Sequence, residues 1–441
     1  MLNGVLAGWM TLLPVGFPSV PAPPSPPAPV AQQAPPSSPA LVAQQTPAAD
    51  VEFRWRDHPQ LRSGRLFRID FVAKFQWDAR HPGDDPPDFD DFEIQRARIG
   101  IEGEFFNRVQ FAVERELTEV EADDPGDPRR SAWKDVYVDA NISDAVQVRA
   151  GKFKIPFGLE QLTGISNLDF VYRSLSARYL APGRDLGVAV HGRLFDDGLN
   201  YWTGWFRQDG ENARSSTIEG AGDTFAVRVT VTPFRSVARL AKAEVSGAFM
   251  LSALENESSD PNGLRGRTIM SRFEYFEPVF VNGTRRRYEV DVDWSAGPVG
   301  ARAEYTHALD SREGQGLADQ NLADARGRGW YVSGTWVLTG EEKERPVQPK
   351  RSIGAVEAAA RYDRLWFDSA GGEPPPLRNP RADSIYPNGD RVLSLGINWY
   401  INRWVKLQFH TLRQTVQDPE RSPVVPNEAY WSPVFRFQVG I

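Results

Sequence analysis

The sequence contains no cysteine, only eight lysines against 43 arginines, five histidines, and no long apolar run after residue 17. The absence of Cys excludes structural disulfides and suits a chain that crosses an oxidising periplasm unfolded. A membrane-spanning helix needs about 20 consecutive apolar residues, so a helical membrane protein is excluded. A net charge of −7 argues against nucleic-acid binding through a basic surface.

Catalytic motifs are also missing. The five histidines are scattered, and neither His-Glu-x-x-His nor Gly-x-Ser-x-Gly occurs. The carboxylates of Asp291 and Asp293 lie two residues apart on one expected strand, but basic neighbours favour ion pairing over acid–base catalysis. The sequence therefore favours a protein that is not an enzyme and has no cofactor or metal.

What the chain does contain is alternation of apolar and polar residues at period two. From Phe67 to Trp77 every odd position is apolar, and Arg68, Asp70, Lys74 and Gln76 lie between them. Sixteen short stretches repeat this pattern, which places one apolar and one charged face on each strand. Mean hydropathy is −0.45 and 11% of residues are aromatic, as expected for strands with one face in lipid, one in water, and aromatic girdles. A soluble aromatic-rich sandwich is the alternative.

Connections between these stretches alternate in length. Long segments at 78–91, 119–131 and 156–183 are interleaved with short ones at 105–107, 142–145 and 195–198. The later strands are expected at 285–296, 299–308, 328–338, 354–364, 391–401, 404–414 and 433–441, with 253–284 as one external loop. The pattern predicts an all-β fold, a single 16-stranded antiparallel transmembrane β-barrel over residues 66–441, with short periplasmic turns and long extracellular loops.

Three segments precede the barrel. Residues 1–17 resemble the apolar region of a secretory signal, although no Lys or Arg precedes it. Residues 18–50 are rich in Pro and Ala and predict a disordered linker, and 51–65 are a lead-in.

Register supports the barrel. A turn at 105–107 would place Arg98 opposite Glu114 and Arg96 opposite Glu116 on the polar face. A turn at 142–145 places Asp139 opposite Arg149, and the Gly297-Pro298 turn places Asp293 opposite Arg302. Such cross-strand charge pairs contribute about 0.2–1 kcal/mol each.

Several blocks resemble the phosphate-selective porin O and P family of outer-membrane channels. They are the Arg-x-Arg strand 92–103, the Gly-Lys-Phe-Lys-Ile-Pro-Phe-Gly block within 148–160, Arg173-Ser-Leu with Arg184-Asp-Leu-Gly, the Leu-Thr-Gly-Glu segment ending at Glu341, and Gly-Ile-Asn-Trp-Tyr within 394–402. Together they span about residues 66–441.

This resemblance implies an outer-membrane diffusion channel for small anions, phosphate or polyphosphate among them, in a Gram-negative-type cell. It implies a homotrimer surrounded by outer-membrane lipid and lipopolysaccharide, with the C-terminal strand read by the barrel assembly machinery. The alternative is a non-conducting adhesin or envelope anchor that uses the barrel as a mount.

An anion filter needs basic side chains that face the lumen. Arg228, Arg361, Lys406 and Arg436 occupy polar-face positions without an obvious carboxylate opposite. Lys152 and Lys154 lie where the alternation changes phase near Gly151, which predicts a bulge. The loop 156–183 is expected to fold inward, bringing Arg173, Arg178 and Arg184 to the constriction. The full set of anion-pathway candidates is Arg96, Arg98, Arg149, Lys152, Lys154, Arg173, Arg178, Arg184, Arg228, Arg361, Lys406 and Arg436.

Overall fold

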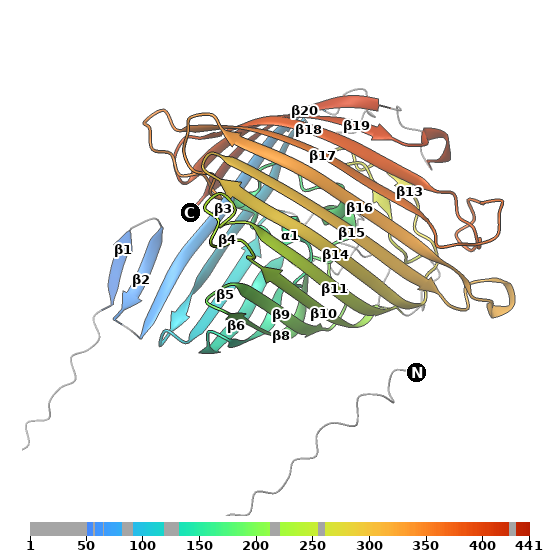
Figure 1. Ribbon diagram of the computed structural model, residues 1–441, viewed down its shortest axis with the longest axis horizontal. Coiled ribbons are helices and arrows are strands. Elements are labelled where there is room, and N and C mark those ends of the chain that lie inside the picture. Colours follow the sequence, from blue (N-terminus) through green and yellow to red (C-terminus); the bar gives the residue numbers. More distant parts are fainter. Residues whose placement is uncertain are drawn as a thin grey trace, which may run out of the picture. The chain divides into compact units, whose positions relative to one another are not determined.

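The structure is a computed structural model, and it describes residues 51–55, 58–64, 66–81, 91–118, 132–211, 221–254, 261–422 and 429–441. In these residues sixteen antiparallel strands form one closed barrel (Figure 1). The strands are β3 (Phe67–Arg80), β4 (Phe92–Phe105), β5 (Val109–Glu116), β6 (Trp133–Ser143), β7 (Val146–Lys154), β8 (Arg184–Leu194), β9 (Leu199–Phe206), β10 (Ala221–Val231), β11 (Glu244–Leu254), β14 (Gly283–Ala296), β15 (Val299–Arg312), β16 (Leu322–Val337), β17 (Ala355–Ser369), β18 (Asn388–Tyr400), β19 (Val405–Val416) and β20 (Ala429–Gly440). The last strand pairs with the first, from Val434 opposite Arg80 to Gly440 opposite Lys74, and this pairing closes the barrel. The predicted 16-stranded antiparallel barrel is confirmed.

Four further strands lie outside the ring. β1 (Glu52–Trp55) and β2 (Pro59–Ser63) form a hairpin in the lead-in, and β2 pairs with β3. β12 (Gly266–Arg267) and β13 (Glu274–Phe276) form a small sheet inside the connection from β11 to β14, which the sequence assigned to one external loop. The predicted signal-like segment 1–17 and linker 18–50 lie outside the described residues.

Helical segments are short. They are α1 (Leu159–Leu162), η1 (Ile165–Asn167), α2 (Leu175–Tyr179), η2 (Leu317–Asp319) and η3 (Pro419–Arg421). None of the helices in the described part of the chain is long and apolar enough to cross a membrane. The first three belong to the connection between β7 and β8.

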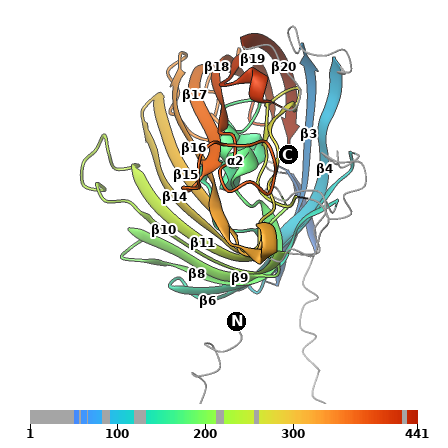
Figure 2. The same ribbon diagram turned by 90° about the vertical axis from the view of Figure 1, so that its right-hand side faces the viewer.

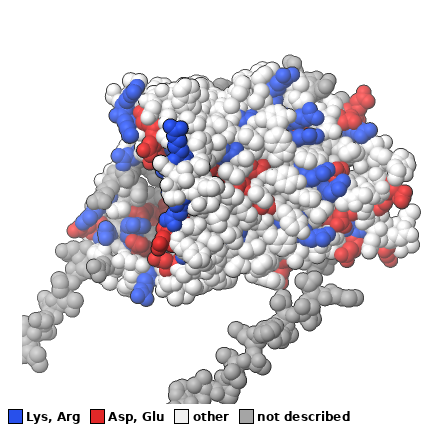
Figure 3. Space-filling view, in the orientation of Figure 1, with Lys and Arg blue, Asp and Glu red and all other residues white. Residues whose placement is uncertain are grey.

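The two faces of the barrel wall differ as the alternation predicts. Outward side chains such as Val290, Val332 and Phe409 are half exposed, whereas their inward neighbours Glu289 and Gln408 are buried. Figure 3 shows the outer face over the later strands: uncharged residues cover most of its middle, and charged residues gather toward its left-hand and right-hand ends. An apolar exterior with a charged interior is the arrangement that lets a barrel stand in lipid around a polar lumen.

Short turns gather at one end of the barrel, together with the C-terminus. The turn 106–108 has Phe106 and Asn107 in the left-handed region (φ of 53° and 54°), and the two-residue turn after β14 has Gly297 at φ 55°. Two connections at this same end are longer, 232–243 and 338–354. The second of these enters the lumen, as described below.

Strand length divides the barrel into two regions. β5 to β11 are 8 to 11 residues long and are here called the low wall. β14 to β20 are 12 to 16 residues long and are called the high wall. About 9–11 tilted residues cross the hydrocarbon core, so the ends of the high-wall strands extend beyond it.

Two of the predicted charge registers are confirmed and one is wrong. Asp139 lies opposite Arg149, and Asp293 lies opposite Arg302. Arg98, however, lies opposite Glu116 and not Glu114, because the turn is centred one residue later than expected, which shifts the pairing by two. The Arg98 guanidinium still reaches both carboxylates, at 2.6 Å to Glu116 and 3.1 Å to Glu114. Arg96 instead donates to Gln76 at 2.8 Å.

Candidate permeation site

The connection 155–183 folds into the barrel, as the sequence predicts. Ile155, Phe157, Leu175 and Leu180 in this loop are fully buried. Figure 2 looks toward the end that carries the long loops and shows α2 inside the ring of strands, where it contacts β16 and β17. Ser174 caps α2 by accepting a hydrogen bond from the backbone N–H of Ala177. The loop therefore occupies part of the lumen and narrows it.

Basic side chains of the high wall hold this loop in place. The Arg361 guanidinium donates to Glu160 of the loop at 2.8 Å and to the Tyr172 carbonyl at 3.0 Å. Arg436 donates to the Val171 carbonyl at 2.6 Å. The Lys406 ammonium donates to the carbonyl of Leu168 at 2.8 Å. Each contact satisfies a backbone or carboxylate acceptor that would otherwise be buried without a partner.

The loop is also held from the short-turn end. Lys343, in the connection 338–354, is fully buried and forms ion pairs with Asp169 of the loop and with Glu357 on β17. Arg345 of the same connection contacts Asp169 at 3.3 Å and Asp293 at 3.2 Å. Sequence reasoning missed both residues. The signal that could have found them is the length of this connection, which is greater than that of every other connection at the short-turn end.

Between the loop and the opposite part of the barrel lies a cavity of about 420 Å³. Its basic lining comes from five strands, β3, β4, β7, β8 and β10, and consists of Lys74, Arg98, Arg149, Lys154, Arg184 and Arg228. Its two carboxylates are Glu114 and Asp135. Four more carboxylates lie behind this lining and pair with its basic groups: Glu116, Asp139, Glu289 and Asp291. The charges of the whole cluster therefore balance, while basic groups form most of the charged surface that faces the cavity.

Three of the cavity's basic groups, Lys74, Arg149 and Arg184, pair with one carboxylate each, whereas Arg98 and Arg228 pair with two. Arg184 makes a bidentate pair with Asp135 at 3.1 and 2.6 Å, and Arg149 donates to Asp139 at 2.8 Å. Lys154 differs, because its ammonium donates to the carbonyls of Leu162 and Thr163, at 3.0 and 3.1 Å. No carboxylate of the described residues forms an ion pair with it.

Aromatic rings support one side of the cavity. The Arg149 guanidinium lies 4.0 Å from the Tyr137 ring centre and 4.9 Å from that of Trp202. His191 stacks on Trp202 with ring centres 3.7 Å apart and contacts Asp139 at 2.9 Å. Stacking and the ion pair together fix the direction in which Arg149 presents its N–H groups.

A family model described as phosphate-selective porin O and P matches residues 69–429. The chain belongs to this family. It is accordingly a channel of the outer membrane and not an enzyme. No curated protein sequence matches the chain.

Solved structures of outer-membrane proteins share the fold of this porin. OmpT of Vibrio cholerae matches at 12% identity with a TM-score of 0.54, covering 87% of this chain and 99% of that one. The outer-membrane channel DcaP of Acinetobacter baumannii matches at 10% identity with a TM-score of 0.55, covering 86% and 99%. OmpF of Salmonella typhi matches at 11% identity with a TM-score of 0.53, covering 87% and 100%. At these identities the likeness concerns the barrel architecture.

The porin's predicted anion-pathway residues divide into two groups. Five line the cavity: Arg98, Arg149, Lys154, Arg184 and Arg228. The others contact different partners. Arg178 donates to the Ile269 carbonyl at 3.0 Å, Lys152 pairs with Glu211 at 3.2 Å, and Arg173 donates to the Thr163 carbonyl at 2.9 Å. Lys74 lines the cavity and was missed, although it lies on the polar face of the first strand.

From the sequence, no carboxylate partner is expected for four basic residues of the polar face: Arg228, Arg361, Lys406 and Arg436. This expectation is wrong for three of them. Arg361 pairs with Glu160 and Asp363, and Arg436 pairs with Asp78 at 2.6 Å. Arg228 reaches across Ala248 on β11 to Glu289 and Asp291 on β14. The small Ala248 side chain leaves room for this contact.

The predicted bulge near Gly151 is absent from the pairing of β7 with β6 and β8. The ladder runs through Gly151 without a register shift, and the shift between β6 and β7 lies between Asn141 and Ser143. Gly151 instead has a φ of 128°, and a Cβ there would lie 2.3 Å from the Val136 carbonyl. Close backbone approach explains the glycine. Among the described residues, no group of His, Asp and Glu side chains is arranged to hold a metal ion.

Proposed function

We propose that this porin conducts small anions, phosphate among them, through the cavity between the loop 155–183 and the strands β3 to β10. The observation that carries the proposal is the lining of that cavity, with six basic side chains and two carboxylates. Fixed cations lower the free energy of an anion at a constriction, and release requires that binding stay weak. Ion pairs such as Arg184 with Asp135 reduce the net charge while leaving other N–H groups of the guanidinium free to face an anion.

The arrangement of these groups suits phosphate and polyphosphate. Arginine presents N–H groups in a planar fork that matches two phosphate oxygens, and lysine contributes a point charge. Lys154 and Arg184 are paired positions on neighbouring strands, so their charges face the same part of the cavity. Adjacent basic groups of this kind offer successive contacts to a chain of phosphate groups.

The proposal includes a homotrimer that forms through the low wall. Its outward side chains Val138, Val188, Leu186 and Trp205 are about half exposed and apolar, and short strands leave little of this wall outside the membrane. One of the fold relatives, OmpT of Vibrio cholerae, was solved in a trimer form. Native mass spectrometry of the detergent-extracted protein tests this part, and a monomer would contradict it. Recognition of β20 by the barrel assembly machinery stays a prediction.

A planar-bilayer recording tests anion conduction with two matched variants. Lys154→Gln removes a lumenal charge that has no carboxylate partner, and it should lower the anion-to-cation permeability ratio about threefold, as expected for loss of about one nearby unit charge. Lys242→Gln removes an exposed lysine at the short-turn end and should leave the ratio unchanged. Phosphate added to one side should reduce the chloride current of the wild-type protein more than that of Lys154→Gln.

Two results would contradict the proposal. Equal permeability ratios for Lys154→Gln and the wild-type protein would remove the cavity from the ion pathway. A folded protein that gives no stepwise conductance would favour the non-conducting adhesin or envelope anchor.

A further inference from the structure

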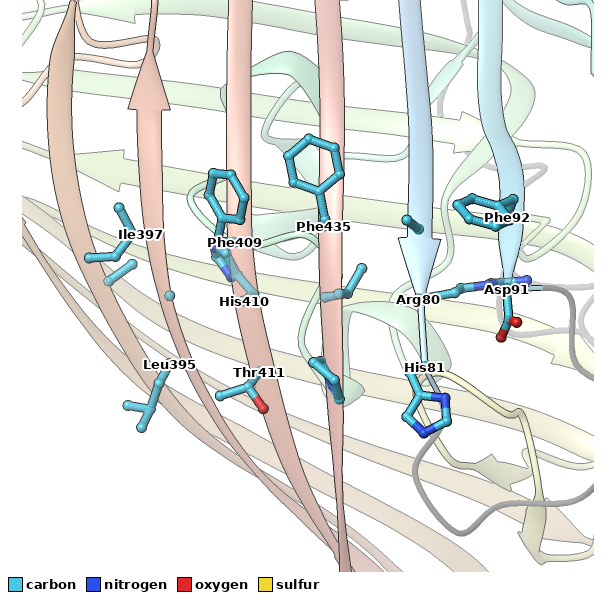
Figure 4. A pocket seen from close by; sticks show the side chains of 15 residues that line it. Arg80, His81, Asp91, Phe92, Leu395, Ile397, Phe409, His410, Thr411 and Phe435 are labelled. Atoms are coloured by element: carbon cyan, nitrogen blue, oxygen red, sulfur yellow. The ribbon is translucent and has the colours of Figure 1, made fainter.

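A groove of about 890 Å³ crosses the lipid-facing surface of the barrel near its closure, over β18, β19, β20 and β3. Figure 4 shows Phe409 and Phe435 at one end of it, with Leu395 and Thr411 toward the other. The groove forms because the short side chains of Thr411 and Pro433 are cross-strand neighbours between larger ones. Its lining is mostly apolar, which suits a hydrocarbon chain.

Arginines lie directly beyond the groove on the same outward face, toward the end with the long loops. Arg413 is two residues beyond Thr411 on β19, and Arg391 is four residues beyond Leu395 on β18. Arg364 on β17 is the cross-strand partner of Arg391. Like charges in directly opposed positions of a sheet are destabilising unless something neutralises them.

No carboxylate of the described residues forms an ion pair with Arg364, Arg391 or Arg413. Arg364 contacts Gln417 at 3.4 Å and the ring of Trp366 at 4.9 Å, and Arg413 lies 5.9 Å from the Trp431 ring. The outward arginines on β14 and β16, by contrast, have carboxylate partners.

On β14 and β16 the outward arginines are neutralised within the protein. Arg286 pairs with Asp324 at 3.1 Å, and Arg326 and Arg328 share Asp368. The three arginines beside the groove thus stand out by their lack of an internal anion.

The depth of these arginines matches the headgroup layer. Arg364 is the tenth residue of β17 from its short-turn end, Arg391 the tenth of β18 from the same end, and Arg413 the ninth of β19. Since about 9–11 residues of a tilted strand span the hydrocarbon core, the guanidinium groups reach the outer interface. The tryptophans beside them, Trp366 and Trp431, are residues that favour this level.

We propose that this groove binds a lipid of the outer leaflet, with an acyl chain along Leu395, Ile397 and Phe409 and a phosphate group held by Arg391 and Arg413. Arg364 lies on the far side of Arg391 and adds to the positive field. Guanidinium groups recognise phosphate by charge-assisted hydrogen bonds, and the phosphate removes the repulsion between the opposed arginines. The occupant is thus a phosphate-bearing lipid, and the site is separate from the ion pathway.

Binding of diphosphoryl lipid A to the full-length protein in neutral detergent, measured by native mass spectrometry, tests the site. The variant Arg391→Gln with Arg413→Gln should weaken binding about tenfold, because two charge-assisted contacts are lost. A matched control, Arg286→Gln with Arg326→Gln, also removes two outward charges and should stay within about twofold of the wild-type protein, since those arginines are partly exposed and already paired.

A third variant tests the acyl groove with the arginines intact. Thr411→Trp fills the groove and should weaken lipid A binding by a similar factor to the double arginine variant. Lipid A stripped of both phosphates should bind the wild-type protein no better than the double variant binds intact lipid A.

Three results would overturn the proposal. They are unchanged affinity in the double arginine variant, equal binding of phosphorylated and dephosphorylated lipid A, and a change of oligomeric state in Thr411→Trp without a change in lipid binding. The last would mean that a second copy of the chain covers the groove.

Discussion

The low wall and the high wall of the barrel carry the same alternation of apolar and charged residues, yet their inward arginines have different roles. On the high wall, Arg361 and Arg436 are almost fully buried and bind the loop 155–183. On the low wall, Arg149 and Arg184 line an open cavity with about one carboxylate each. The difference lies in what covers each wall. Where a loop packs against one side of a barrel, the charged side chains beneath it bind the loop. The charged side chains on the other side of the barrel then remain in contact with the lumen.

The largest effect should come from detaching the loop from the high wall. Arg361→Gln combined with Arg436→Gln leaves Glu160, Asp363 and Asp78 without their cationic partners. Each broken buried pair should lower the free energy of unfolding by roughly 3 kcal/mol. Single-channel conductance should rise, because the loop no longer narrows the lumen, and urea should unfold the variant at lower concentration.

An exposed arginine provides the control for that change. Arg193→Gln on β8 removes a half-exposed guanidinium that pairs with Asp144 and Asp197. Exposed ion pairs of this kind contribute about 0–1 kcal/mol to the free energy of unfolding. If the double variant has the conductance of Arg193→Gln, the loop is not held by the high wall in the way described.

A smaller effect is expected from the connection 338–354. Lys343→Met leaves the carboxylates of Asp169 and Glu357 short of a cation, although Arg345 still contacts Asp169. Stability should fall by about 3 kcal/mol, and the open-channel current should become noisier as the loop gains freedom. Lys350→Met, an exposed lysine of the same connection, should change neither quantity. Equal noise in the two variants would show that the short-turn end does not restrain the loop.

The smallest effect should come from Arg149→Lys on the low wall. The charge stays, so the channel's ion preference should keep its sign. The loss of ring stacking on Tyr137 and Trp202 should lower the free energy of unfolding by about 1 kcal/mol. Bilayer recording and urea unfolding check the two quantities separately. A reversal of ion preference would mean that Arg149 acts through geometry more than through charge.

The fold could be predicted almost completely because period-two alternation assigns each side chain to a face and the connection lengths set strand direction. Register was less secure. A turn centred one residue later moved Arg98 from Glu114 to Glu116, since each residue of turn displacement shifts cross-strand partners by two.

The site could be predicted only in part, because alternation says which residues point inward and not what lies beside them. Arg436 meets Asp78 only when β20 closes on β3, and these residues are 358 apart in the sequence. Arg361 meets Glu160 only because a loop 201 residues away folds across the lumen. Pairing arguments between consecutive strands cannot reach such contacts.

The reversal potential of the wild-type channel across a KCl gradient tests the central claim most directly. If the cavity beside the loop 155–183 governs permeation, the basic groups that line it make chloride carry most of the current, and the reversal potential takes the sign of the chloride equilibrium potential. A reversal potential at zero, or one with the sign of the potassium equilibrium potential, would contradict the account.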